Sequence, residues 1–345
     1  MNSLRKLIQE NPYSTLSTQV LRNSFLLPTW LGTTLIDQLT WPLNEQMDYI
    51  YKIENEHFKG ALIMPGIAQS NDDDSAIERL KKADIVIFEI HGGAFVVGNC
   101  TMYISSFISW INFLKEKYQL DACVMTIEYG LAPMNKYPGP VNECVSAYTY
   151  LTQDLGVSPS RIIVSGDSAG GTLAIETLVN IYAPDIFKAK RPSLQIPLPA
   201  GLLLSSPFLS SDTSTESWIK YEKTDMVSKA ANQVVSKRYF NFPNSKIEDI
   251  PALNLMKIEE FKRFMPKHVW VIFGKQEVFY DSIIEMFDKV KREGGIEVEL
   301  IQEDLSHDWF MFPQVIDFKH RHIVKKYDEL FVDFVVKAVK EASEC

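Results

Sequence analysis

The sequence predicts an α/β fold in which helices flank a mostly parallel, eight-stranded sheet and a helical cap covers one end. Short apolar runs recur along the chain and, in its later part, alternate with helical segments. Residues 83–90 are almost continuously apolar, as expected of a parallel strand that is buried on both faces. Glycine-rich turns follow two of the predicted strands, at residues 91–95 and 166–170. In parallel sheets, such turns at the carboxyl ends of strands carry functional groups.

The predicted strands are short, and polar or glycine-containing segments separate them. They cover residues 47–53, 60–64, 84–90, 122–128, 161–165, 201–205, 268–273 and 297–302. Helices are predicted at residues 171–180 and at about 281–292. Residues 71–75, with three consecutive aspartates, predict an exposed acidic loop and not a metal site.

The second glycine-rich turn reads Gly166-Asp167-Ser168-Ala169-Gly170 and lies between a buried strand and a helix. A strand, a Gly-x-Ser-x-Gly turn and a helix form the nucleophile elbow of an α/β-hydrolase. Side chains at Gly166 or Gly170 would clash with the crowded strand or helix. We therefore predict that Ser168 is a nucleophile. The alternative, a solvated serine in an ordinary turn, leaves the following features unexplained.

The first glycine-rich turn reads His91-Gly92-Gly93-Ala94-Phe95 and follows the apolar strand at residues 84–90. A loop at this position supplies backbone N–H groups to an oxyanion hole. Each fixed donor aimed at the developing charge contributes about 10² to 10³ in rate. Alone, the motif is equally well explained as a plain strand-to-loop turn. Together with the elbow it predicts oxyanion donors.

The general base follows the nucleophile in the chain of this fold, which leaves four histidines to consider. His268 begins a predicted strand and is therefore expected at the wrong end of the sheet. His320 and His322 lie in a basic stretch that opens the C-terminal helix, typical of a solvated surface. His307 follows the last predicted strand through a short polar loop, so we predict that His307 is the base.

Two carboxylates are candidates for the acid that orients the histidine. Glu277 and Asp281 both follow the strand predicted at residues 268–273. Asp281 is well placed as the N-cap of the next helix, which is a structural role. Glu277 lies in the loop before it and is preferred, with Asp281 as the alternative acid.

Three motifs together, HGGAF, GDSAG and SHDWF, resemble the hormone-sensitive-lipase-like family of α/β-hydrolase esterases. The resemblance covers roughly residues 45–340 and includes the segments at residues 128–133 and 137–140. It implies that the oxyanion donors are Gly93, Ala94 and Ala169, with Gly92 of the same loop as a further candidate. It also matches Glu277 to the acid of the family, which is usually an aspartate.

The chain departs from the family pattern at specific positions. Ala94 replaces a glycine but keeps its backbone N–H, and Glu277 is one methylene longer than aspartate. Gly130 and Met134 occupy positions where the family has arginine and glutamate. Those side chains normally help to brace the floor of the active site, so the sequence leaves that bracing open.

The resemblance implies a serine carboxylic-ester hydrolase that acts on short- to medium-chain acyl esters and needs no metal or organic cofactor. The HGGAF and MYISSF regions favour a steryl-acetate or small-ester deacetylase. Three alternatives remain. One is an amidase of the same fold, similar to aryl formamidases, and another is a membrane-associated acyl-lipid hydrolase. The third is a non-catalytic small-molecule receptor, although receptors resembling this scaffold have lost the histidine.

Composition limits the class of protein. The 345 residues are 46% hydrophobic and can bury a sizeable core. The net charge of −9 argues against a nucleic-acid partner. Cys100, Cys123, Cys144 and Cys345 lack metal-ligand spacing, and Cys123 and Cys144 are predicted core residues. Residues 1–10 precede no apolar signal region and no run reaches about 18 apolar residues, so we expect a cytoplasmic protein.

Two segments fall outside the strand pattern and predict a cap. We expect residues 1–45 to form an N-terminal cap segment and residues 46–345 a catalytic domain with a cap insertion at about 206–265. Residues 24–43 are apolar and aromatic, which favours a cap helix, with contact to a membrane surface or lipid droplet as the alternative. The insertion is expected to line a substrate pocket, or to be an ordinary helical pair, and is rich in large apolar side chains: Trp218, Tyr221, Met226, Tyr239, Phe240 and Phe242.

Overall fold

The computed structural model describes residues 13–188, 192–240 and 255–344. Residues 1–10, Phe242 and Cys345, which entered the sequence analysis, lie outside these ranges.

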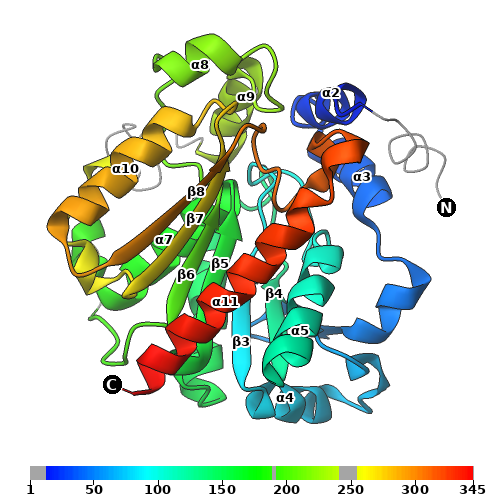
Figure 1. Ribbon diagram of the computed structural model, residues 1–345, viewed down its shortest axis with the longest axis vertical. Coiled ribbons are helices and arrows are strands. Elements are labelled where there is room, and N and C mark those ends of the chain that lie inside the picture. Colours follow the sequence, from blue (N-terminus) through cyan, green and yellow to red (C-terminus); the bar gives the residue numbers. More distant parts are fainter. Residues whose placement is uncertain (1–12, 189–191, 241–254, 345) are drawn as a thin grey trace.

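A single eight-stranded sheet in the order β1-β2-β4-β3-β5-β6-β7-β8 forms the centre of the molecule (Figure 1). β1 and β2 run antiparallel to their neighbours, and the remaining strands are parallel. The predicted eight-stranded, mostly parallel sheet is therefore confirmed. The strands are β1 (Ile50–Glu54), β2 (Lys59–Ile63), β3 (Ile85–Ile90), β4 (Ala122–Ile127), β5 (Ile162–Asp167), β6 (Gly201–Ser205), β7 (His268–Gly274) and β8 (Glu297–Glu303).

Helices cover both faces of the sheet (Figure 1). α5 and α11 pack together on one face, whereas α7 lies on the opposite face and packs against α6. The α-helices are α2 (Thr15–Ser24), α3 (Thr29–Thr40), α4 (Asp73–Lys82), α5 (Ile104–Tyr118), α6 (Gly139–Thr149), α7 (Ala169–Tyr182), α8 (Glu216–Tyr221), α9 (Lys229–Tyr239), α10 (Tyr280–Glu293) and α11 (Ile323–Ser343).

Two local predictions were wrong, because backbone hydrogen bonding and capping overrode the sequence pattern. The first strand begins at Ile50, since Asn44–Tyr49 form a 3₁₀ helix. The acidic segment at residues 71–75 is largely the start of α4. The Asp72 carboxylate accepts a hydrogen bond from the Ser75 N–H at 2.8 Å and caps that helix.

An aromatic cluster joins the sheet to α5 and α11. The ring centroids of Trp110 and Phe331 lie 4.7 Å apart, and those of Trp270 and Phe331 lie 5.6 Å apart. The carboxylate of Asp328 accepts hydrogen bonds from Trp110 Nε1 and Ser109 Oγ, both at 2.7 Å. Burial raises the pKa of Asp328 to about 7. Cys123 and Cys144 are fully buried, as predicted for core residues.

The register of the parallel strands brings their carboxyl ends to one edge. Ile90 of β3 pairs with Gly166 of β5, and Gly274 of β7 pairs with Glu303 of β8. The start of α7 lies directly against this edge. A Cβ on Gly170 would come within 2.0 Å of the carbonyl oxygen of Ile90, and one on Gly166 within 2.4 Å of that of Gly170. The crowding predicted at these two glycines is confirmed.

The N-terminal helices and the insertion after β6 meet over this edge (Figure 1). Arg22 of α2 donates hydrogen bonds to the carbonyl oxygens of Glu222 and Asp225, at 2.7 and 2.6 Å. In return, Arg238 of α9 donates to the carbonyl oxygen of Leu27 at 2.7 Å. Hydrogen bonds therefore join two segments that are far apart in the sequence, and we refer to these two segments together as the cap.

The apolar segment at residues 24–43 includes α3, which turns one side towards the interior. Ile36 and Leu39 are buried, whereas Trp30 and Trp41 are 71% and 63% exposed. In the parts of the chain that the structure covers, no helix is long and apolar enough to cross a membrane.

The close approach of α7 to β3 predicts the effect of one substitution. Gly170→Ala should destabilise the fold by about 3 kcal/mol or more, because the added methyl overlaps backbone atoms that cannot rotate away. Gly156→Ala is the control. Its Cβ would meet nothing within 4 Å, so only the positive φ of 68° costs about 1 kcal/mol. Chemical denaturation of both variants measures the difference, and equal stability would contradict the proposed crowding.

Candidate active site

Ser168, His307 and Glu277 come together at the carboxyl edge of the sheet, from the loops that follow β5, β8 and β7. Ser168 Oγ lies 3.0 Å from His307 Nε2, within hydrogen-bonding distance. His307 Nδ1 lies 3.7 Å from Glu277 Oε1, a distance that suits an ion pair but is long for a hydrogen bond. Such contacts are often loose without substrate and shorten when it binds. The order serine, histidine and carboxylate is that of a nucleophile, its base and the group that orients the base.

Ser168 sits in a strained backbone conformation, with φ 48° and ψ −115°. This conformation is held from both sides: the Ser168 N–H donates to the carbonyl oxygen of Ser205 at 2.8 Å, and its own carbonyl accepts from the Phe208 N–H at 2.9 Å. The strain is therefore imposed by β6 and the segment after it. It turns the half-buried hydroxyl away from the sheet, where an incoming carbonyl can reach it.

The carboxylate of Glu277 is completely buried and fixed through its second oxygen. Oε2 accepts hydrogen bonds from the Gly274 N–H at 2.8 Å and from Ser206 Oγ at 2.7 Å. Ser206 Oγ also accepts from the Asp308 N–H at 2.9 Å. One hydroxyl thus joins the loop that carries the acid to the loop that carries His307. No sequence pattern pointed to Ser206, because its role depends on contacts between three separate loops.

Asp281, the alternative acid, points to a different partner. Its Oδ2 accepts a hydrogen bond from the Ser217 N–H at 2.7 Å and so holds the first turn of α8. The prediction that Asp281 is the N-cap of α10 was wrong, because the helix begins at Tyr280 with Phe279 as its N-cap. The structure therefore places Glu277 beside His307 and gives Asp281 a role in anchoring the cap.

Asp225, which the sequence analysis did not identify, is a second buried carboxylate near the histidine. Its Oδ2 accepts from the Val278 N–H at 2.7 Å, directly after Glu277, and its Oδ1 accepts from the Val227 N–H at 3.2 Å. Burial raises the pKa of Asp225 to about 6; the positive charge of His307 lowers it and the negative charge of Glu277 raises it. Asp225 therefore links the cap insertion to the loop that carries the acid.

The surroundings of His307 stabilise its protonated form. Burial by itself would lower its pKa, but the adjacent carboxylate of Glu277, with the charges of Asp225 and Asp167, outweighs burial. The pKa of His307 is consequently raised above its ordinary value of 6.5. The ring of Phe279 meets the imidazole edge to face at 5.0 Å and limits its rotation.

The loop after β3 has the backbone of an oxyanion-binding turn. Gly93, Ala94 and Phe95 all have positive φ angles, of 97°, 55° and 62°. A Cβ on Gly93 would come within 2.1 Å of the Val97 carbonyl oxygen, so only glycine fits there. Among the described residues, no backbone acceptor engages the N–H groups of Gly93 or Ala94.

The inclusion of Gly92 among the oxyanion donors was wrong. Its N–H donates to Asp167 Oδ1 at 2.8 Å and is therefore occupied. The same carboxylate accepts from Tyr103 Oη at 2.6 Å through Oδ2. Gly92 thus fixes the loop to the elbow, and the remaining candidates are Gly93, Ala94 and Ala169.

The bracing that the sequence left open comes from other side chains. Tyr129 Oη donates to the carbonyl oxygens of His91 and Gly92, at 2.8 and 3.1 Å, and its ring stacks on His91 at 4.2 Å. Met134 is 93% exposed and contributes no bracing. Gly130 has no side chain that could brace the site. Its backbone N–H donates a hydrogen bond to Glu143 Oε2 at 2.7 Å.

A pair of buried acids lies beneath the nucleophile. Burial raises the pKa of Asp167 to about 6, against hydrogen bonds from Tyr103 and Asp308 that lower it. Burial and the charge of Asp167 raise the pKa of Asp308 well above its usual range. Burial thus favours the protonated forms of both acids, and for Asp308 the negative charge of Asp167 adds to this effect.

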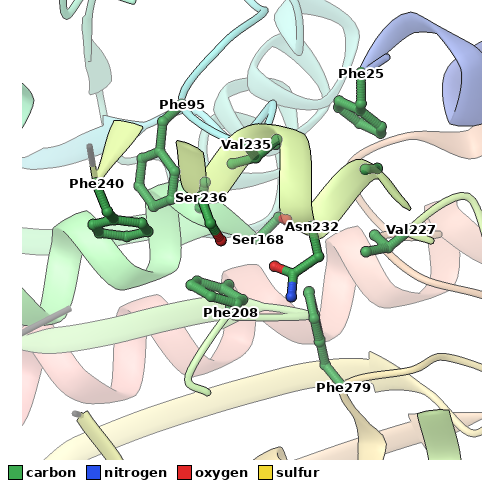
Figure 2. Close-up of a pocket in the computed structure, with 13 residues that line it drawn as sticks. Phe25, Phe95, Ser168, Phe208, Val227, Asn232, Val235, Ser236, Phe240 and Phe279 are labelled. Atoms are coloured by element: carbon green, nitrogen blue, oxygen red, sulfur yellow. The ribbon is translucent and has the colours of Figure 1, made fainter. Parts of the chain in front are cut away.

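An apolar cavity of about 40 Å³, which opens to solvent, leads to Ser168 (Figure 2). Both cap segments contribute to its walls, together with the oxyanion loop and the elbow. Of the large side chains that were predicted to line a pocket and that the structure describes, only Phe240 does so, whereas Trp218 and Tyr239 are buried in the packing of the cap. The lining residues are Phe25, Ala94, Phe95, Ser168, Ala169, Phe208, Val227, Ala231, Asn232, Val235, Ser236, Phe240 and Phe279.

Comparison with known proteins agrees with this geometry. Residues 87–311 match a family described as having the alpha/beta hydrolase fold, and this match covers the oxyanion loop, the elbow and His307. The chain belongs to this α/β-hydrolase family. The resemblance to hormone-sensitive-lipase-like proteins that the motifs predicted is also confirmed, since bovine hormone-sensitive lipase is among the similar proteins.

The alignments with individual curated relatives cover about half or less of each relative's length. The chain is 31% identical to an esterase of Acinetobacter venetianus over 164 residues, which are 47% of this chain and 48% of that protein. It is 35% identical to mouse arylacetamide deacetylase over 107 residues, 29% of this chain and 26% of that protein. The crystal structure of an esterase from the bacterial hormone-sensitive lipase family shares the fold, with a TM-score of 0.69 and 20% identity. That alignment covers 98% of this chain and 99% of the other.

Within the described residues of this α/β-hydrolase, one group of three side chains has the spacing of metal ligands: His268, Glu297 and Glu341. It lies at the start of β7, the end of the sheet opposite to Ser168, where His268 was predicted. Lys267 Nζ is 2.5 Å from Glu341 Oε2 and 3.5 Å from Glu297 Oε1. Lys337 Nζ also lies 3.0 Å from Glu297 Oε2, so two lysines balance the two carboxylates and the group is explained as an ion-pair network.

The two acids can be distinguished by the titration of His307. Glu277→Gln should lower the pKa of His307, because the nearest negative charge that stabilises the imidazolium is removed. Asp281→Asn is the matched control and should leave that pKa unchanged, since its carboxylate contacts Ser217. Histidine NMR across pH 4 to 9 measures both. A larger shift in the Asp281 variant would show that the wrong acid has been placed beside His307.

Proposed function

We propose that this α/β-hydrolase is a serine carboxylic-ester hydrolase for small apolar esters. The 3.0 Å contact between Ser168 Oγ and His307 Nε2, at the mouth of an apolar cavity, is the observation that carries the proposal. The names of its relatives, which include an esterase, support the same class of reaction. The aromatic and aliphatic lining favours acyl or alcohol groups of short to medium length.

In the proposed mechanism, Ser168 Oγ attacks the ester carbonyl carbon while His307 Nε2 takes the hydroxyl proton. The N–H groups of Gly93, Ala94 and Ala169 stabilise the resulting oxyanion. The C–O bond to the alcohol then breaks, and His307 gives its proton to the leaving oxygen. Water attacks the acyl-enzyme with its proton passing to His307, the acid is released, and the proton returns to Ser168. Glu277 orients the imidazole and stabilises its charged form throughout.

Amide hydrolysis by the same residues is a second candidate function. It is favoured by the similarity to mouse arylacetamide deacetylase, whose name describes removal of an acetyl group from an aryl amide. The reaction would differ in one requirement, because His307 must protonate a nitrogen leaving group. The raised pKa of His307 suits that step as well as ester cleavage.

Steryl acetates are one specific member of the proposed ester class. Their acetyl group is short and their alcohol is large and apolar, which requires the cavity mouth to remain open under the cap. A non-catalytic receptor is disfavoured, since a receptor has no need of a histidine within hydrogen-bonding distance of the serine.

Kinetics with p-nitrophenyl esters from acetate to palmitate test the proposal. We expect hydrolysis of the shorter esters, and loss of both turnover and fluorophosphonate labelling in Ser168→Ala. Glu277→Gln should lower kcat by about 10³ to 10⁴, because the imidazole loses its orienting charge. Asp281→Asn should stay within a few fold of the unaltered enzyme.

Substrate class is read from the same assay. Comparing p-nitrophenyl acetate with p-nitroacetanilide separates ester from amide hydrolysis, and cholesteryl acetate tests the steryl hypothesis. If no ester or amide is turned over and Ser168 is not labelled, the hydrolase proposal is wrong and ligand binding becomes the better explanation.

A further inference from the structure

The cavity beside Ser168 contains two polar side chains that the proposed reaction does not use. Asn232 and Ser236 lie one helical turn apart on α9, and both extend into the space bordered by Phe208 and Phe240 (Figure 2). Both are half-buried. Apart from Ser168 itself, every other lining residue is apolar.

The amide of Asn232 has no structural task in α9. The N-terminus of this helix is capped by Ser228, whose Oγ accepts from the Ala231 N–H at 3.0 Å. Arg238, on the same helix, makes the bond to the N-terminal cap segment. No hydrogen bond or ion pair to the Asn232 side chain occurs within the described parts of the chain. Asparagine is also a weaker helix former than leucine or alanine, so helix propensity does not favour it at this position.

An amide in an apolar cavity discriminates between ligands. When a ligand displaces water from Asn232 without replacing its hydrogen bonds, a buried polar group is left unsatisfied, which costs binding free energy. A ligand that supplies a matching donor or acceptor avoids that cost. Sites built around such a group reject analogues that lack it more strongly than an apolar pocket rejects an extra methylene.

The polar group on the ligand is expected to be neutral. None of the lining residues carries a charge, and five of them are phenylalanines. A carboxylate or ammonium group would lose its hydration without gaining an ion pair. A hydroxyl, carbonyl or amide can be satisfied by Asn232 and by the hydroxyl of Ser236.

We propose that Asn232, assisted by Ser236, is a specificity-determining residue that selects esters whose apolar part carries a neutral hydrogen-bonding group. This inference rests on the proposed ester hydrolysis and narrows its substrate class. The phenylalanines bind the apolar part of the substrate, and Asn232 binds its polar substituent. The substituent would lie on the acyl or the alcohol side, whichever enters the cavity beneath α9.

The test uses pairs of esters that differ in one hydroxyl group. On the acyl side, the pair is p-nitrophenyl 3-phenylpropanoate and p-nitrophenyl 3-(4-hydroxyphenyl)propanoate, with butanoate and 3-hydroxybutanoate as a smaller pair. On the alcohol side, the pair is 2-phenylethyl acetate and 2-(4-hydroxyphenyl)ethyl acetate. For each pair, the ratio of kcat/KM with and without the hydroxyl is measured in the same enzyme preparation, so a loss of active protein cancels.

The ratios are compared between the unaltered enzyme, Asn232→Leu and Asn232→Ala. The alanine variant suits the helix and keeps the test valid if the leucine variant packs poorly. Gln233→Leu is the matched control, because Gln233 is next to Asn232 in the helix but its side chain is exposed and does not line the cavity. Ser236→Ala measures the contribution of the second polar group.

In at least one pair, the ratio of kcat/KM for the hydroxylated ester to kcat/KM for the other ester should be about tenfold higher in the unaltered enzyme than in either Asn232 variant. Gln233→Leu should give the same ratio as the unaltered enzyme. Ser236→Ala should give a smaller loss in the same pair. Ratios that are unchanged by both Asn232 variants in all three pairs would overturn the inference while leaving ester hydrolysis intact. Failure of the unaltered enzyme to cleave any ester would instead overturn the proposed function, and this inference with it.

Discussion

The contact between the start of α7 and the end of β3 is the constraint on which the rest of the site depends. Gly170 lies so close to the Ile90 carbonyl that no side chain fits between them. This contact brings the elbow next to the loop after β3. The bond from the Gly92 N–H to Asp167 then fixes the two loops to each other. Because both loops are held, Ser168 and the free N–H groups of the oxyanion loop keep their relative positions without help from substrate.

Buried carboxyl groups dominate the electrostatics around His307. The carboxylates of Glu277, Asp225 and Asp167 all raise its pKa. Burial and the charge of Asp167 favour the protonated form of the neighbouring Asp308. The charged form of the histidine is therefore stabilised, and in the proposed mechanism this is the form that His307 adopts when it takes the proton of Ser168. The cost of burying these acids is offset by backbone N–H donors and by the hydroxyls of Ser206 and Tyr103.

The cap lines the cavity beside Ser168 and is also hydrogen-bonded to the loop that carries Glu277. Arg22 of α2 binds the backbone carbonyl of Asp225, while the carboxylate of Asp225 holds the loop next to Glu277. The N-terminal helices, the insertion and the triad loops are thus consecutive parts of one hydrogen-bonded structure. Phe25 from the N-terminal segment and Asn232 from the insertion consequently face the same cavity.

The sequence by itself determined the sheet, the elbow and the histidine. Those features depend on local sequence. An apolar run predicts a buried strand, and two glycines on either side of a serine predict an elbow. The choice between Glu277 and Asp281 was decided only by the tertiary structure, because both follow the same strand and the distinction depends on what Ser206 and Ser217 contact. Gly92, Asp225 and Asn232 were likewise beyond the sequence. Gly92 contacts the carboxylate of Asp167, Asp225 contacts the Val278 N–H, and Asn232 faces the cavity. These surroundings come from distant segments of the chain, so local sequence patterns do not predict them.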